Sequence, residues 1–273
     1  MTTHPEGAAP APGADRRTAP NWIPKAAPGA GRSTGRGAGR RTTPGAVVTV
    51  VRYLLLDRMM YLVLPWAWAA FGFVLDVVVL RLTPAGHTDH RWVGGLAAVF
   101  LVTFTVGVQS VARALPYALT LGVSRRTYFL GATALAVAMA ACFGLLVGVG
   151  QIAERATGGW GMHMAYFRVP YLLDGPWYLS WLTASVVFVL LFVYGMWYGL
   201  VFRRGGLPGC TAFGAAQLTV LALAAVVTTW AHGWHRIGHF FAAVTATGVT
   251  GLLAAAVLVL IAGGFATIRR LAV

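Results

Sequence analysis

The chain has 273 residues, of which 58% are hydrophobic and only 10% are charged, too few charges to cover the surface of a soluble domain of this length. Its net charge of +14 comes from residues in a low-complexity tail and at the ends of apolar segments, a distribution that argues against nucleic-acid binding. The two cysteines, Cys142 and Cys210, lie in or beside apolar segments without a second pair, so neither a disulfide framework nor a zinc site is expected.

Residues 1–45 form a segment rich in proline, glycine, alanine and arginine, with almost no large apolar side chains. Because such a segment cannot bury enough surface to fold, we expect a disordered N-terminal tail. It has no apolar stretch of the kind found in a secretory signal peptide. Its basic residues suit a tail kept in the cytoplasm by membrane orientation, or one that also binds anionic lipid.

Residues 46–273 are expected to form one all-α transmembrane domain. Residues 46–58 are apolar but contain Arg52, which favours a short helix in the membrane interface over the tilted start of the first span. Six apolar segments of about 20 residues follow, the length that about 30 Å of hydrocarbon requires of a helix. The six predicted spans are residues 59–80, 93–112, 128–151, 179–202, 211–230 and 240–267.

The distribution of basic residues predicts the orientation of these spans. With both termini in the cytoplasm, sixteen of the 21 basic residues lie on the inner side and five on the outer side. Basic loops are retained in the cytoplasm, so we predict a polytopic membrane protein with six transmembrane helices and both termini cytoplasmic. The preference for arginine over lysine, with the high alanine and glycine content, favours a bacterial plasma membrane as its location.

The sequence offers little to catalysis. Lys25 is the only lysine and lies in the tail, outside any G-x-x-x-x-G-K-[ST] loop, so the chain is not expected to hydrolyse nucleotide by that route. It also has no H-E-x-x-H motif and no paired acidic residues within one helix. We therefore predict that the chain is not an enzyme and holds no cofactor of its own.

The segment between the second and third predicted spans is a basic break between two apolar segments. Pro116 is expected to end the second helix near Leu115, and Ser124 to cap the third helix. A short helix around Tyr117 would lie between them. Three arginines flank it: Arg113, Arg125 and Arg126. Arginine is poorly placed at a helix N-terminus, but membrane orientation or an acidic partner explains it, and a membrane protein could use such a helix to receive force from a soluble subunit.

Residues 122–131, GVSRRTYFLG, resemble the segment that begins the third helix in permeases of the type-2 ABC transporter family. In that family a small residue, a serine and one or two arginines precede an aromatic residue and then a glycine. Its members have six helices per chain, cytoplasmic termini and an interfacial helix before the first span. Two departures are Ala132, where the family often has lysine, and residues 109–110, where an acidic residue often opens the loop.

The resemblance implies that the chain is the membrane-spanning permease subunit of an ABC transporter. Export is the expected direction, because most members of the family export. A separate ATP-binding subunit would dock on a coupling helix within residues 113–127. Two permease chains, identical or related, would form the pathway through the lipid bilayer. The candidate coupling residues are Arg113, Pro116, Tyr117, Ser124, Arg125, Arg126 and Tyr128.

Histidines on the predicted outer side support an alternative function of a different class, the binding of metal or haem. Three histidines spaced by three and four residues would share a helix face, and a Met-His-Met segment suits Cu(I). The candidate ligands are His232, His235, His239, Met162, His163 and Met164. No thiolate or carboxylate cluster completes a site, and interfacial histidines also hydrogen-bond to headgroups and water, so we predict no metal site. A membrane scaffold without transport activity is a third possibility.

Asp76 lies inside the first predicted span, about one turn from its outer end. An acidic residue within a span is a candidate for a transport pathway by default. Arg81 is close enough in sequence for a local ion pair, so snorkelling or pairing with Arg81 also explains Asp76.

Small-residue pairs occur in two predicted spans. Gly195 and Gly199 form a G-x-x-x-G motif in the fourth, and Gly248 and Gly251 are three residues apart in the sixth. Such pairs permit close approach of helices, although in a chain with 34 glycines each is weak support for a particular interface.

Overall fold

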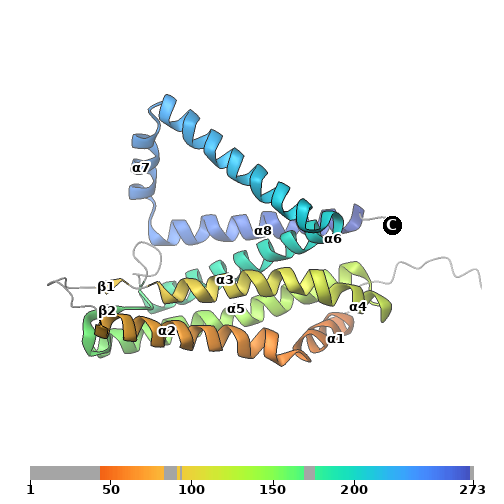
Figure 1. The fold of residues 1–273 in the computed structure, drawn as a ribbon, viewed down its shortest axis with the longest axis horizontal. Helices are drawn as coiled ribbons and strands as arrows, with labels where there is room; N and C mark the ends of the chain where they lie inside the picture. Colours follow the sequence, from red (N-terminus) through yellow and green to blue (C-terminus); the bar gives the residue numbers. More distant parts are fainter. Residues whose placement is uncertain (1–43, 83–90, 93, 169–175, 271–273) are drawn as a thin grey trace, which may run out of the picture. The chain divides into compact units, whose positions relative to one another are not determined.

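The computed structural model describes residues 44–82, 91–92, 94–168 and 176–270. Almost all of the predicted tail, residues 1–45, lies outside the described residues. Helices dominate the described residues, and the sheet found among them is a parallel pair of two-residue strands, β1 (Arg91–Trp92) and β2 (Met164–Ala165). The prediction of an all-α fold is therefore confirmed (Figure 1).

Five helical segments in the described part of the chain are long and apolar enough to cross a membrane. The first combines π turn η1 (Met59–Val63) with α2 (Leu64–Leu82), and the second combines α3 (Gly95–Gln109), π turn η2 (Ser110–Ala114) and α4 (Leu115–Thr120). The other three are α5 (Arg125–Ala156), α6 (Trp177–Trp230) and α8 (Ala246–Arg270). The chain thus has the helices of a multi-pass membrane protein.

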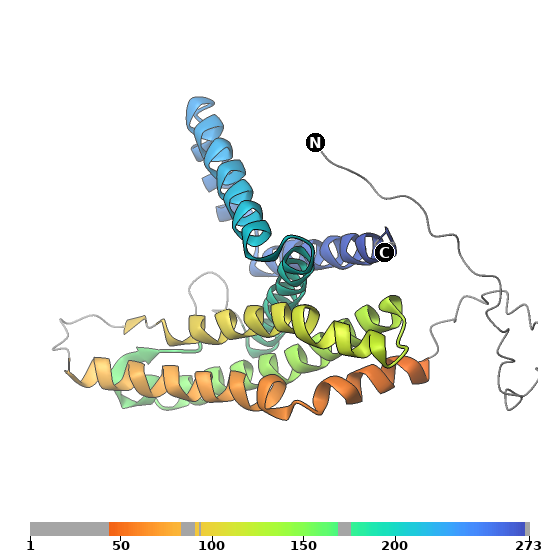
Figure 2. The same cartoon turned by 45° about the vertical axis from the view of Figure 1, so that its right-hand side comes forward.

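Helix α6 combines the predicted fourth and fifth spans in 54 residues. A straight helix of this length would measure about 81 Å, far more than the hydrocarbon thickness of about 30 Å. Gly206 interrupts it with φ 60° and ψ −154°, a conformation open essentially to glycine alone, and Pro208 lacks a backbone N–H. Figures 1 and 2 show the change of direction. The loop predicted at residues 203–210 is instead helical on both sides of a corner at Gly206.

The predicted sixth span, residues 240–267, is divided between two helices. Its first residues belong to α7 (Trp234–Ala243), and α8 begins only at Ala246. Val244 between them is extended, and the Thr245 hydroxyl accepts the Gly248 N–H at 3.3 Å, which caps α8. Apolar composition continues across this break, so the break could not be seen in hydropathy.

Helix α1 (Pro44–Leu55) forms where a short helix was predicted at residues 46–58. The chain leaves α1 before Asp57, whose carboxylate accepts the Met60 N–H at 3.2 Å at the start of the next helix. Val50 and Leu54 on α1 are buried in the same cluster as Tyr128 on α5. Burial of one face fixes α1 against the bundle, while its position in a membrane interface stays a prediction.

Glycines allow α3 and α6 to pack closely. A Cβ atom at Gly199 would lie 2.7 Å from the Val108 carbonyl oxygen, and one at Gly195 would overlap the Phe104 carbonyl oxygen. The predicted G-x-x-x-G motif is therefore confirmed as a helix-packing site. The second pair behaves differently, because a Cβ atom at Gly251 would meet nothing within 4 Å.

Candidate functional site

The candidate coupling segment begins with a correction to the sequence prediction. Pro116 does not end the helix, which continues through α4 to Thr120. The π turn η2 ends at Ala114, two residues before Pro116, and its wider hydrogen-bonding pattern lets the helix pass a residue that lacks an N–H. The hydroxyl of buried Tyr128 donates to the Ser110 carbonyl and so ties this turn to α5.

The connection from α4 to α5 is a tightly hydrogen-bonded turn. Gly122 has φ 78°, its N–H donates to the Leu119 carbonyl at 3.0 Å, and the Val123 N–H donates to the Ala118 carbonyl at 3.1 Å. This pattern is the Schellman motif that terminates many helices. Ser124 then accepts the Thr127 N–H at 3.1 Å, which confirms the predicted N-cap of α5. The turn therefore holds α4 at a fixed angle to α5.

The exposed face of this segment is both aromatic and basic. Tyr117 and Leu121 are 68% and 70% exposed, and Arg113 and Arg126 are exposed beside them in sequence. We call these four residues the α4 surface. Buried Leu115 and Ala118 anchor its other side in the core, while Arg125 is only partly exposed. Burial, and after it the nearby Tyr117, raises the pKa of Tyr53 on α1. Tyr53 and Leu119 of α4 pack against the same buried cluster, so α1 lies beside α4.

Asp76 and Arg81 have partners other than each other. The Asp76 carboxylate accepts the Gly95 N–H at 2.8 Å and so caps the first turn of α3. The Arg81 Nε donates toward the Met162 sulfur at 3.2 Å. Each of the two residues thus contacts a residue distant in the chain, where the sequence suggested a local Asp76–Arg81 pair. The Asp76 hydrogen bond joins α2 to α3.

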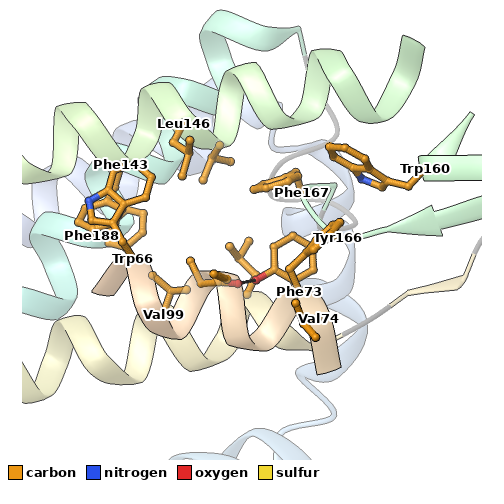
Figure 3. A pocket seen from close by; sticks show the side chains of 14 residues that line it. Trp66, Phe73, Val74, Val99, Phe143, Leu146, Trp160, Tyr166, Phe167 and Phe188 are labelled. Atoms are coloured by element: carbon orange, nitrogen blue, oxygen red, sulfur yellow. Dashed lines mark hydrogen bonds between the residues drawn. The ribbon is translucent and has the colours of Figure 1, made fainter. Parts of the chain in front are cut away.

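An apolar cavity of about 360 Å³ lies among α2, α3, α5 and α6. Trp66, Phe143 and Phe188 gather at one end of it, and Trp160 and Phe167 lie at the other (Figure 3). Stacked rings build the first end, with centroids of Trp66 and Phe143 4.9 Å apart and those of Phe143 and Phe188 5.1 Å apart. Its walls are apolar and aromatic apart from the Tyr166 hydroxyl and the indole N–H groups, and suit a hydrocarbon or aromatic ligand.

Tyr166 links this cavity to α2. Its hydroxyl donates to the Ala69 carbonyl at 2.9 Å, and its ring lies edge-on to Phe73 with centroids 5.3 Å apart. Burial, and after it the charge of Asp76, raises the pKa of Tyr166 to about 12. The hydroxyl therefore stays protonated at neutral pH and remains a hydrogen-bond donor.

Glu154 is a structural residue that the sequence prediction missed. It is 2% exposed at the end of α5, and one carboxylate oxygen accepts the N–H groups of Tyr166 and Phe167, both at 2.9 Å. These bonds hold Tyr166 and Phe167, two residues that line the cavity, against α5. The other oxygen is buried without a partner among the described residues. Because Arg155 follows it, Glu154 resembles an ordinary surface charge at the end of a span. The sequence signal that could have indicated a buried role is its position at the end of a long apolar segment.

The candidate metal ligands do not converge. Met164 is buried in the core, Met162 receives Arg81, and His163 is exposed. His232 lies in the turn before α7 with φ 50°. Within the described ranges no group of three or more histidine, cysteine or acidic residues could hold a metal ion. What remains is a pair on α7, His235 and His239, whose Nε2 atoms are 3.2 Å apart.

The structure thus provides an exposed, tightly held basic surface at the α4–α5 connection and an apolar cavity near the two-stranded sheet. Comparisons of the chain with protein-family models, with curated proteins and with solved structures found no match.

Proposed function

We propose that the chain is the membrane-spanning permease subunit of an ABC transporter, an exporter, driven by a separate ATPase chain that binds the α4 surface. The observation that carries this proposal is the α4 surface itself. It combines an exposed aromatic ring and an exposed leucine with two exposed arginines. Aromatic and arginine side chains are enriched in protein interfaces, and the positive charges would steer an acidic partner.

The local architecture suits transmission of force. α4 continues α3 without a break, and the capped turn leads directly into α5. The Tyr128–Ser110 hydrogen bond joins the same two helices one to two turns further along the bundle. A displacement of the α4 surface would therefore move α3 and α5 together, and the close α3–α6 packing at Gly195 and Gly199 would carry it to α6.

The proposed membrane arrangement has six spans, since the two apolar halves of α6 cross separately on either side of Gly206. Both termini, the tail and the α4 surface lie in the cytoplasm, and α1 lies in the interface of a bacterial plasma membrane. The bias of basic residues supports this orientation. A second permease chain, identical or related, completes the pathway.

A charge-reversal experiment tests the α4 surface. Arg113→Glu combined with Arg126→Glu should abolish binding of the ATPase subunit, because both charges lie on the proposed contact. Arg203→Glu combined with Arg204→Glu is the matched control, since it makes the same charge change at two exposed arginines of α6. Co-purification from mild detergent, with membrane insertion checked for every variant, gives the readout.

The proposal predicts loss of the ATPase only in the α4 variant. Equal binding by both double variants and by the unaltered chain would remove the α4 surface as the docking site. Absence of an ATPase from the unaltered chain would contradict the permease function itself.

A further inference from the structure

α7 carries two exposed histidines whose side chains meet. His235 and His239 are one helical turn apart, so they project from the same face of α7. Their Nε2 atoms are 3.2 Å apart, and the rings are nearly perpendicular, at 86°, with centroids 4.4 Å apart. Both residues are exposed, so water or another molecule can reach the two nitrogens.

The separation of the two nitrogens matches the bite of a metal chelate. Imidazole nitrogens bind Zn²⁺ at about 2.0–2.1 Å, so two nitrogens 3.2 Å apart would subtend an angle of about 103° at the ion. That angle lies between the octahedral value of about 90° and the tetrahedral value of about 109°. An ion could thus occupy the space between the rings with little rearrangement of α7.

We propose that His235 and His239 form a two-histidine site for a divalent transition-metal ion of the Zn²⁺, Ni²⁺ and Cu²⁺ group. Imidazole is a preferred ligand for these ions, and affinity within the group is highest for Cu²⁺. Water molecules fill the remaining coordination positions, because no third histidine, cysteine or acidic side chain among the described residues joins the pair. This site is independent of ATPase coupling at the α4 surface.

Proton balance constrains how the ion binds. In the metal-free pair one Nε2–H donates to the other Nε2. The ion needs a lone pair on both Nε2 atoms, so the donating ring must move its proton to Nδ1 and adopt the other neutral tautomer. Arg236 is the charged residue nearest to the pair in sequence. It follows His235 by one residue, which is a rotation of about 100° around the helix axis, so its side chain projects away from the two histidines.

The consequence for the protein is a cross-link over one turn of α7. A helix of 10 residues is marginal without tertiary contacts, and residues 234–240 of α7 are exposed. Because the ion binds the folded turn and not an unwound one, it stabilises α7. Metal would therefore slow hydrogen exchange within α7.

The test uses the full chain, purified in detergent with a tag that contains no histidine and treated with a chelator. Cu²⁺ binding is followed by electron paramagnetic resonance, where imidazole nitrogens give a hyperfine pattern, and Zn²⁺ binding by calorimetry. The variants are His235→Ala and His239→Ala. The matched controls are His232→Ala, in the turn before α7, and His163→Ala, an exposed histidine elsewhere.

Either α7 variant should lower the affinity by more than about tenfold, since even partners outside a coordination sphere often cost that much. The two controls should bind as the unaltered chain does. Moving one ligand, with His239→Ala and Ile237→His together, should also abolish tight binding, because side chains two residues apart on a helix do not face each other. Unchanged binding in the α7 variants, or an equal loss in His232→Ala, would overturn the proposal. Monodisperse elution of each variant shows that the result does not come from misfolding.

Discussion

Replacing Gly199 with alanine would force α3 and α6 apart. The added Cβ atom would lie 2.7 Å from the Val108 carbonyl oxygen and 2.8 Å from the Val111 Cβ atom, whereas ordinary contacts begin at 3.4 Å. The helices would have to separate locally by about 0.7 Å in a core packed as tightly as a crystal. Overpacking of this kind costs about 1–3 kcal/mol.

Alanine also has a better helix propensity than glycine, by about 1 kcal/mol, which offsets part of that cost. We therefore expect Gly199→Ala to lower the stability of the protein by about 0–2 kcal/mol, which is about 1–3 kcal/mol below a variant that gains the propensity without the clash. Gly251→Ala is the matched control, since its Cβ atom would meet nothing within 4 Å and only the gain in propensity remains. Thermal unfolding of both variants in one detergent gives the comparison.

The midpoint of unfolding should fall for Gly199→Ala and stay equal or rise slightly for Gly251→Ala. A Gly199→Ala variant as stable as Gly251→Ala would refute the close α3–α6 crossing. It would also remove the route by which motion at the α4 surface is proposed to reach α6.

Two further predictions concern buried hydrogen bonds. Glu154→Ala leaves the N–H groups of Tyr166 and Phe167 without their acceptor. Each buried group without a hydrogen-bond partner costs about 1–3 kcal/mol, so hydrogen exchange in the segment after β2 should accelerate. Exchange in α1, which does not contact this segment through these bonds, should stay unchanged. Tyr128→Phe removes the hydroxyl that donates to the Ser110 carbonyl. The midpoint of thermal unfolding should fall by an amount equivalent to about 1 kcal/mol. An unchanged midpoint would mean that this hydrogen bond does not stabilise the π turn.

Local chemistry in the sequence predicted the elements that depend on neighbouring residues. Ser124 caps α5 because its hydroxyl reaches an N–H three residues on, and Gly195 with Gly199 marks a helix crossing because small residues allow close approach. Apolar length likewise located the helices. These features need only residues close together in the chain.

The features that the sequence did not predict depend on distant residues or on backbone geometry. Asp76 caps α3 across 19 residues, and Glu154 accepts from a segment 12 and 13 residues away. Pro116 is tolerated because a π turn precedes it, although proline within a helix ordinarily predicts a break. Gly206 bends α6 without a loop, so the connection predicted at residues 203–210, between the fourth and fifth spans, is a change of direction at a single residue.

Cross-linking from the α4 surface tests the central proposal most directly. A photoreactive amino acid would replace the exposed Tyr117 in the full chain, expressed in the cells in which the protein naturally occurs. The cross-linked product would be identified by mass spectrometry. The same substitution at the exposed Trp230, at the far end of α6, is the control. We predict that position 117 captures a soluble protein with a phosphate-binding loop and that position 230 does not. Capture of lipid alone, or of a protein without such a loop, at position 117 would contradict the permease function.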